Sequence, residues 1–170
     1  MFKIIKFVLI IVLSENLISC NTNKIDIENF SGIELNDNNI GKTNYYILLP
    51  KGWYVSEDVG PDFIVYYICS EVDDSEEEIT FGGLYFGNHP SKFTEDYGKQ
   101  YSSDNYVYSK ILGKYKKWEI FKIDDYYFTE VIMRNPGSGL WNRKVHIWAN
   151  GNTQEELQKM IYIYSLIKKK

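Results

Sequence analysis

Two histidines and one acidic run are the residues whose types could support catalysis or metal binding. A Ser-His-Asp unit needs a nucleophile beside the histidine and a third group that orients it, and the sequence has no Gly-x-Ser-x-Gly motif. His89, between Asn88 and Pro90, is predicted to be a turn residue. His146 alternates with apolar neighbours, which predicts an outward-facing histidine at the surface or rim of a sheet. We therefore expect no enzyme activity; a hydrolase using Glu or Asp pairs is the enzymatic alternative.

The acidic run occupies residues 71–78 and holds six carboxylates. It lacks the Gly-interrupted Asp spacing of an EF-hand loop, and the chain has no Cys-x-x-Cys or His-x-x-x-His motif. No metal or cofactor is predicted, although a Ca²⁺ site and a simple solvated loop both stay open as alternatives. The functional interpretation is an acidic surface that attracts a basic protein partner. The predicted partner-binding residues are Asp73, Asp74, Glu76, Glu77, Glu78, Tyr85 and His89.

Aromatic residues are unusually abundant, with 15 Tyr, 9 Phe and 4 Trp. Tyr and Trp are enriched at binding hot spots, but they also form cross-strand pairs in sheets. Seven of these aromatic residues cannot all lie in the core, and each could serve either in partner binding or in cross-strand pairing. They are Tyr85, Tyr97, Tyr101, Tyr106, Tyr108, Trp118 and Trp141.

The first 20 residues have the layout of an export signal that ends at a cysteine. Lys3 and Lys6 make a positive start, residues 7–13 are all apolar, and Leu17-Ile18-Ser19-Cys20 follows. The apolar stretch is much shorter than the roughly 20 residues that span a membrane, and it suits a signal peptide.

The Leu17-Ile18-Ser19-Cys20 segment resembles the lipobox of bacterial lipoproteins. The resemblance implies cleavage before Cys20 and lipid, palmitate included, on its sulfur and new amino group. Asn21 after the cysteine implies sorting to the outer membrane, at its periplasmic face. The expected organisation is a signal peptide at 1–19, a lipid-anchored polar tether at 20–42 and a single domain at 43–170.

Cys69 lies in an apolar run and is predicted to be a buried, inert thiol, with a reactive thiol as the alternative. If Cys20 carries lipid, Cys69 has no partner within the chain. The opposing interpretation is a Cys20–Cys69 disulfide behind an ordinary signal peptide, but the leader lacks the small-residue cleavage pattern of such signals.

Charge and length narrow the class of protein. Removing residues 1–19 leaves 151 of 170 residues, which suits one domain, and changes the net charge from −4 to −5 because Lys3, Lys6 and Glu15 are lost. An acidic chain is a poor candidate for binding nucleic acid. It also disfavours peripheral binding to anionic lipid, so the only membrane link expected is the lipid on Cys20.

Apolar runs and turn residues predict a meander of strands. The expected strands are 45–49, 63–69, 79–86, 107–112, 117–123, 126–134 and 144–149, with a helix within 91–100 and a two-residue turn at Asp124-Asp125. Gly82-Gly83 predicts a bulge or a close approach. Thr153 followed by Glu156 matches a capping box and begins an amphipathic C-terminal helix.

These elements predict an α+β fold: an antiparallel sheet of about six or seven strands packed by a C-terminal amphipathic helix. The strand that ends in Leu49-Pro50-Lys51-Gly52-Trp53, together with the capped helix, resembles the PsbP-like fold of small exported lipoproteins.

The chain also resembles, in type and in the stretch 84–90, periplasmic immunity lipoproteins of contact-dependent, type VI-like secretion systems. That resemblance implies an inhibitor that binds and occludes a toxin. The alternative is a PsbP-like envelope lipoprotein that assembles or stabilises a membrane complex.

Overall fold

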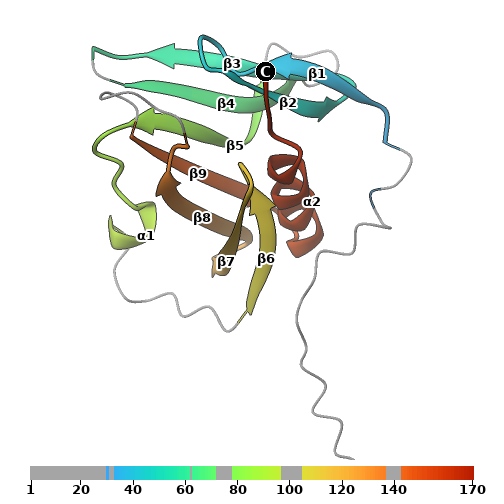
Figure 1. Cartoon of the computed structure of the whole chain (residues 1–170). Helices are drawn as coiled ribbons and strands as arrows, with labels where there is room; N and C mark the ends of the chain where they lie inside the picture. The colour runs from blue at the N-terminus through green and yellow to red at the C-terminus, as the bar shows by residue number, and fades with distance from the viewer. Residues whose placement is uncertain (1–29, 31–32, 62, 72–77, 97–104, 137–142) are drawn as a thin grey trace, which may run out of the picture.

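Strands form most of the protein. The structure is a computed structural model that describes residues 30, 33–61, 63–71, 78–96, 105–136 and 143–170 (Figure 1). The strands in these ranges are β1 (Leu35–Asn39), β2 (Tyr45–Pro50), β3 (Trp53–Val59), β4 (Ile64–Glu71), β5 (Glu78–Gly87), β6 (Asn105–Ile111), β7 (Lys114–Ile123), β8 (Tyr126–Arg134), β9 (Lys144–Gly151) and β10 (Lys168–Lys169). The helices are α1 (Phe93–Asp96) and α2 (Gln154–Ser165).

Seven strands make one antiparallel sheet in the order β3-β4-β5-β9-β8-β7-β6. The predicted two-residue turn joins β7 to β8, and Asp124 adopts a φ of 49° there, which Asp tolerates better than most residues. The register of β4 and β5 shifts between Ile68 and Cys69, opposite Gly82. The predicted α+β fold, with a largely antiparallel sheet and a C-terminal helix, is confirmed.

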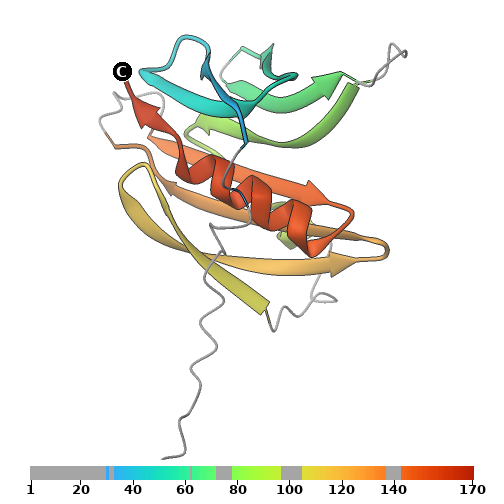
Figure 2. The same cartoon turned by 90° about the vertical axis from the view of Figure 1, so that its right-hand side faces the viewer.

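One face of this sheet is closed. Helix α2 lies across it, and the small sheet β1-β2-β10 packs beside the helix, as Figure 2 shows. Val145, Ile147 and Ala149 of β9 point into this layer, as their alternation predicts, and all three are fully buried. Leu157 and Ile161 of α2 meet them in one continuous core.

The ends of α2 follow from its sequence. Thr153 is the N-cap, and its side chain accepts a hydrogen bond from the Glu156 backbone N–H at 3.1 Å. Glu156 reaches back and accepts from the backbone N–H of Asn152 at 2.8 Å, one residue before the partner expected in a capping box. Asn152 thereby ties the end of β9 to the start of the helix.

The folded body extends further toward the N-terminus than the predicted boundary at residue 43. Strand β1 pairs with β2 inside the segment expected to be a tether, and Ile40 is fully buried. Phe30 stacks on Tyr162 of α2 with ring centroids 5.3 Å apart, so a residue before β1 also packs on the folded body.

Among the described members of the aromatic set, Trp118 lies in the core. It is fully buried on the helix side of β7, stacked on Tyr164 at 6.1 Å. Tyr85 and Tyr106 are half-buried, and Tyr108 is 49% exposed. Tyr97, Tyr101 and Trp141 lie outside the described residues.

Candidate binding face

A buried pair of hydrogen-bonded side chains marks the other face of the sheet. Glu130 of β8 and His146 of β9 lie diagonally across the ladder, two residues out of register, since Glu130 pairs with Trp148 and Ile132 with His146. His146 Nε2 is 2.7 Å from Glu130 Oε2, and both side chains are only 3% exposed. A carboxylate can only accept hydrogen bonds, so Nε2 carries the proton.

Helix α1 buries this couple. The backbone N–H groups of Phe93 and Thr94 donate to the two carboxylate oxygens of Glu130, each at 3.0 Å, and the Thr94 hydroxyl donates as well. The ring of Phe93 lies 4.9 Å from the imidazole of His146. The prediction of a surface or rim position for His146 is therefore wrong, because α1 covers the strand face that alternation correctly assigned to it.

Hydrogen bonding sets the charge state of Glu130. Burial alone would raise the pKa of this carboxyl group, but the bonds from His146, Thr94 and Phe93 outweigh it and lower the pKa from 4.5 to about 2. Glu130 is therefore ionised over the physiological range. Its bonds fix α1 to the sheet, and α1 in turn positions Phe93.

An apolar cavity of about 450 Å³, here called the Tyr85 cavity, opens beside Phe93. This volume falls in the range of ligand-binding cavities. The polar groups at its wall are His89, Ser91 and His146. The apolar wall consists of Phe63, Val65, Tyr67, Tyr85, Pro90, Phe93 and Trp148.

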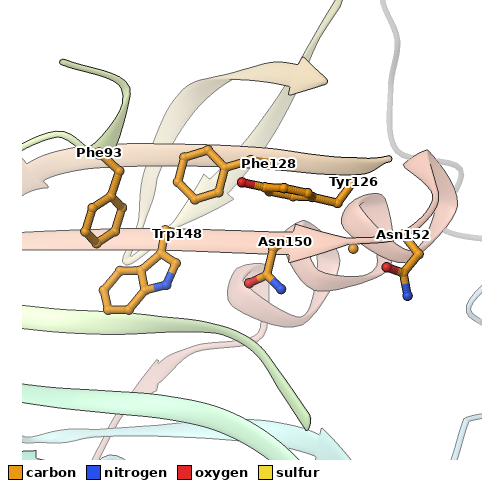
Figure 3. Close-up of a pocket in the computed structure, with 7 residues that line it drawn as sticks. Phe93, Tyr126, Phe128, Trp148, Asn150 and Asn152 are labelled. Carbon is orange, nitrogen blue, oxygen red and sulfur yellow. The ribbon is translucent and has the colours of Figure 1, made fainter. Parts of the chain in front are cut away.

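A second cavity of about 490 Å³, here called the Asn150 cavity, lies further along β9 (Figure 3). Phe93 and Trp148 line both cavities. Their rings meet edge to face, with centroids 5.3 Å apart, and form the partition between them. The other lining residues are Tyr126, Phe128, Asn150, Gly151 and Asn152.

Gly83 gives Trp148 its place on this face. It lies opposite both Trp148 and Tyr67 in the sheet, and a Cβ at Gly83 would be 2.5 Å from Trp148 Cζ2. The absence of a side chain lets the indole lie over the strand, where Tyr67 meets it edge to face at 6.1 Å. The predicted close approach at Gly82-Gly83 is thus confirmed, and it serves the cavity wall.

The structure brings only part of the predicted partner-binding set together. Tyr85 and the exposed His89 both line the Tyr85 cavity, and His89 lies in the segment that connects β5 to α1. Glu78 begins β5, opposite Glu71. It therefore lies seven residues from Tyr85, or about 23 Å along the strand. Cys20 and the loop residues Asp73, Asp74, Glu76 and Glu77 lie outside the described residues.

Cys69 is a buried free thiol, as predicted. Burial, followed by contact with Glu78, raises its pKa to about 11, so the unreactive thiol form prevails at neutral pH.

Within the part of the chain that the structure describes, no three His, Cys, Asp or Glu side chains are grouped to hold a metal ion. A search of the same residues finds no helix with the length and apolar character to cross a membrane.

Sequence reasoning missed Glu130, Phe93 and Trp148 as members of one site. A usable signal existed for Trp148, because strand alternation places it on the same face as His146. The role of Glu130 had no such signal, since it depends on where α1 lies. Comparisons of the chain with models of protein families, with curated proteins and with solved structures found no match.

Proposed function

We propose that this chain is a lipid-anchored binding protein of the bacterial envelope that holds a protein partner against the open face of its sheet. The Tyr85 cavity supports the proposal. It is apolar and aromatic, it is rimmed by the exposed His89, and its wall is held by the buried Glu130–His146 couple. Tyr and Trp pockets of this kind are where interface hot spots concentrate.

The most specific form of the proposal is an immunity protein that occludes a toxin targeted to the periplasm. The lipobox-like Leu17-Ile18-Ser19-Cys20 segment favours a periplasmic location at the outer membrane, and the resemblance to immunity lipoproteins favours a toxin as partner. Occlusion needs only a surface complementary to the toxin's cleft, so no catalytic group is required of this chain.

The finer description of the fold is part of the same proposal. Strand β2 runs into the Pro50-Lys51-Gly52-Trp53 turn, and β9 leads through Thr153 into the C-terminal helix. Both features suit the PsbP-like arrangement that the sequence resembles, and such bodies are common in exported lipoproteins.

Binding is tested with the product of the adjacent gene. The full chain and that product are co-expressed with their own leaders, and we expect them to co-purify. Phe63→Ala removes a wall of the cavity and is expected to weaken the complex roughly 30-fold, the loss typical of a hot-spot truncation. Tyr115→Ala is the matched control because Tyr115 is 77% exposed on the far hairpin, and it should change the affinity less than twofold.

Protection is tested in cells. Deleting this chain should make cells sensitive to the neighbouring product when it is directed to the periplasm, and the Phe63→Ala chain should restore less resistance than Tyr115→Ala. Cells that stay insensitive after the deletion would contradict the immunity function. Capture of several envelope proteins unrelated to any toxin would instead support the assembly role.

The anchor has its own test. Cells grown with radiolabelled palmitate should label the wild-type chain and leave the Cys20→Ser variant unlabelled. An unlabelled wild type, or label that survives the substitution, removes the anchor from the proposal.

A further inference from the structure

Two basic side chains lie on the same sheet face as the Tyr85 cavity. Arg134 at the end of β8 lies directly opposite Lys144 at the start of β9, and both are exposed. Lys144 shares strand parity with His146 and Trp148, so its side chain projects on the cavity face. Lys144 also pairs with Gly87, just beyond Tyr85 on β5.

This placement is unfavourable for the isolated fold. Like charges directly opposite each other on neighbouring strands destabilise a sheet. Of the side chains that the structure describes, no carboxylate lies within ion-pair distance of Arg134 or Lys144. The chain as a whole is acidic, with a net charge of −4. A pair of basic side chains two residues along β9 from the cavity wall therefore departs from the general surface. Such a site is complementary to an external anion.

The cavity and the basic pair are within reach of one ligand. Lys144 and His146 are two residues apart on β9, which is about 7 Å along a strand. A short peptide spans this distance with one or two residues between an apolar side chain and a carboxylate.

We propose that the Tyr85 cavity receives one large apolar side chain of a partner polypeptide, and that Arg134 and Lys144 bind an Asp or Glu carboxylate next to it in the same segment. This inference rests on the proposed function and defines the partner's side of the contact. It also reverses the expectation drawn from the acidic run, because the charge sought at the cavity is negative.

The shape of the face favours a peptide over an acyl chain. Phe93 and Trp148 divide the open face into two compartments of about 450 and 490 Å³. Separate compartments suit separate side chains, whereas a long acyl chain needs one continuous channel.

The test uses a displayed library of random 12-residue peptides, selected on the full chain held in phospholipid nanodiscs. We expect enrichment of peptides that carry Phe, Tyr, Trp or Leu within three residues of Asp or Glu. When the selection is repeated on the double variant R134E/K144E, the enriched peptides should carry Lys or Arg in place of the acidic residues and should keep the apolar residue. A synthetic peptide from the first selection should bind this variant roughly tenfold more weakly than wild type.

The matched control is K168E/K169E, which reverses two exposed charges on β10 and should leave the selected peptides unchanged. The neutral variant R134Q/K144Q is used if R134E/K144E does not fold. Peptides selected on R134Q/K144Q should show no preference for acidic residues. Each variant is used only after its urea unfolding midpoint has been compared with that of wild type.

Enrichment without acidic residues, acidic preference that survives R134E/K144E, or no enrichment at all would each overturn the inference. Saturable binding of oleate in place of any peptide would assign the cavity to a lipid and overturn it as well. These outcomes differ from failure of the proposed function, because co-purification with the neighbouring product can persist while the peptide preference fails.

Discussion

The two faces of the seven-stranded sheet are covered to different extents and by different interactions. On one face, α2 and the small sheet cover apolar residues such as Ile147 and Leu157, which are fully buried. On the other, the short helix α1 covers the Glu130–His146 couple, and two cavities lie beside it. The first face is held by burial of apolar area, and the second is held by a few hydrogen bonds to one carboxylate.

This difference separates stability from binding. Apolar burial along twelve residues of α2 is spread over many contacts, so no single polar group decides it. The open face depends on Glu130 because the bonds to that carboxylate position α1 and therefore Phe93. A face fixed in this way can present aromatic walls to a partner without losing its shape.

The largest effect on stability is expected when a side chain in the closed face is truncated. Ile147→Ala should lower the free energy of unfolding by about 2–5 kcal/mol, because it leaves a cavity in a fully buried layer. Ile132→Ala, on the neighbouring strand but on the open face, should cost clearly less because Ile132 is only half-buried. Urea unfolding of both variants measures the contrast, and equal losses would contradict the distinction between the faces.

The next effect is the acid sensitivity of the open face. The pKa of Glu130 is lower in the folded chain, about 2 against 4.5, so the unfolded chain takes up the proton more readily. The stabilisation by Glu130 is therefore complete above pH 4.5 and is lost as the pH falls toward 2. It is on the order of 3 kcal/mol.

Glu130→Gln isolates this contribution. The variant should be less stable than wild type at pH 7, and the difference should shrink as the pH approaches 2. Unfolding free energies measured across this range give the answer. A constant difference between the two proteins would mean that ionised Glu130 does not hold α1.

A smaller loss is expected where Gly83 admits Trp148. Gly83→Ala should cost about 1–3 kcal/mol through overpacking and should shift the fluorescence of Trp148. Gly52→Ala is the control: Gly52 has a φ of 82° and open space around it, so its cost, about 1 kcal/mol, comes from the backbone alone. An unchanged emission spectrum in Gly83→Ala would contradict the role of Gly83 in the cavity wall.

The smallest effect concerns the start of α2. Thr153→Ala removes the cap and should lower stability by about 1 kcal/mol, whereas Thr153→Ser keeps the hydroxyl and should stay near wild type. Because the cap lies at the margin of the closed face, peptide selection on Thr153→Ala should match wild type. A changed preference would link the two faces.

Local pattern was enough to predict most of the sheet and the last helix. Alternation placed Val145, Ile147 and Ala149 on one face, and Thr153 marked the start of α2. Three strands were missed: β1, β3 and the two-residue β10. Strand β3 contains the polar run Ser56-Glu57-Asp58, and β1 is Leu-Asn-Asp-Asn-Asn, a poor strand former. Pairing with β4 and β2 overrides these preferences.

The site was less predictable because it is assembled by tertiary contacts. Tyr85 and His89 were identified from sequence as partner-binding residues, and they do line one cavity. Glu130 sits within a largely apolar strand, where its burial depends on backbone donors 36 and 37 residues away. No pattern around β8 indicates those donors.

The most direct test of the account is a cross-link from the open face in living cells. The photoreactive amino acid p-benzoylphenylalanine is placed at Tyr85 or, as the control, at Tyr115 in the full chain. We expect Tyr85 to cross-link to a segment of the partner carrying a large apolar residue next to Asp or Glu, and we expect the product to be lost in R134E/K144E. Cross-links from Tyr115 alone, or none from Tyr85 while the partner still co-purifies, would contradict the claim that the open face binds.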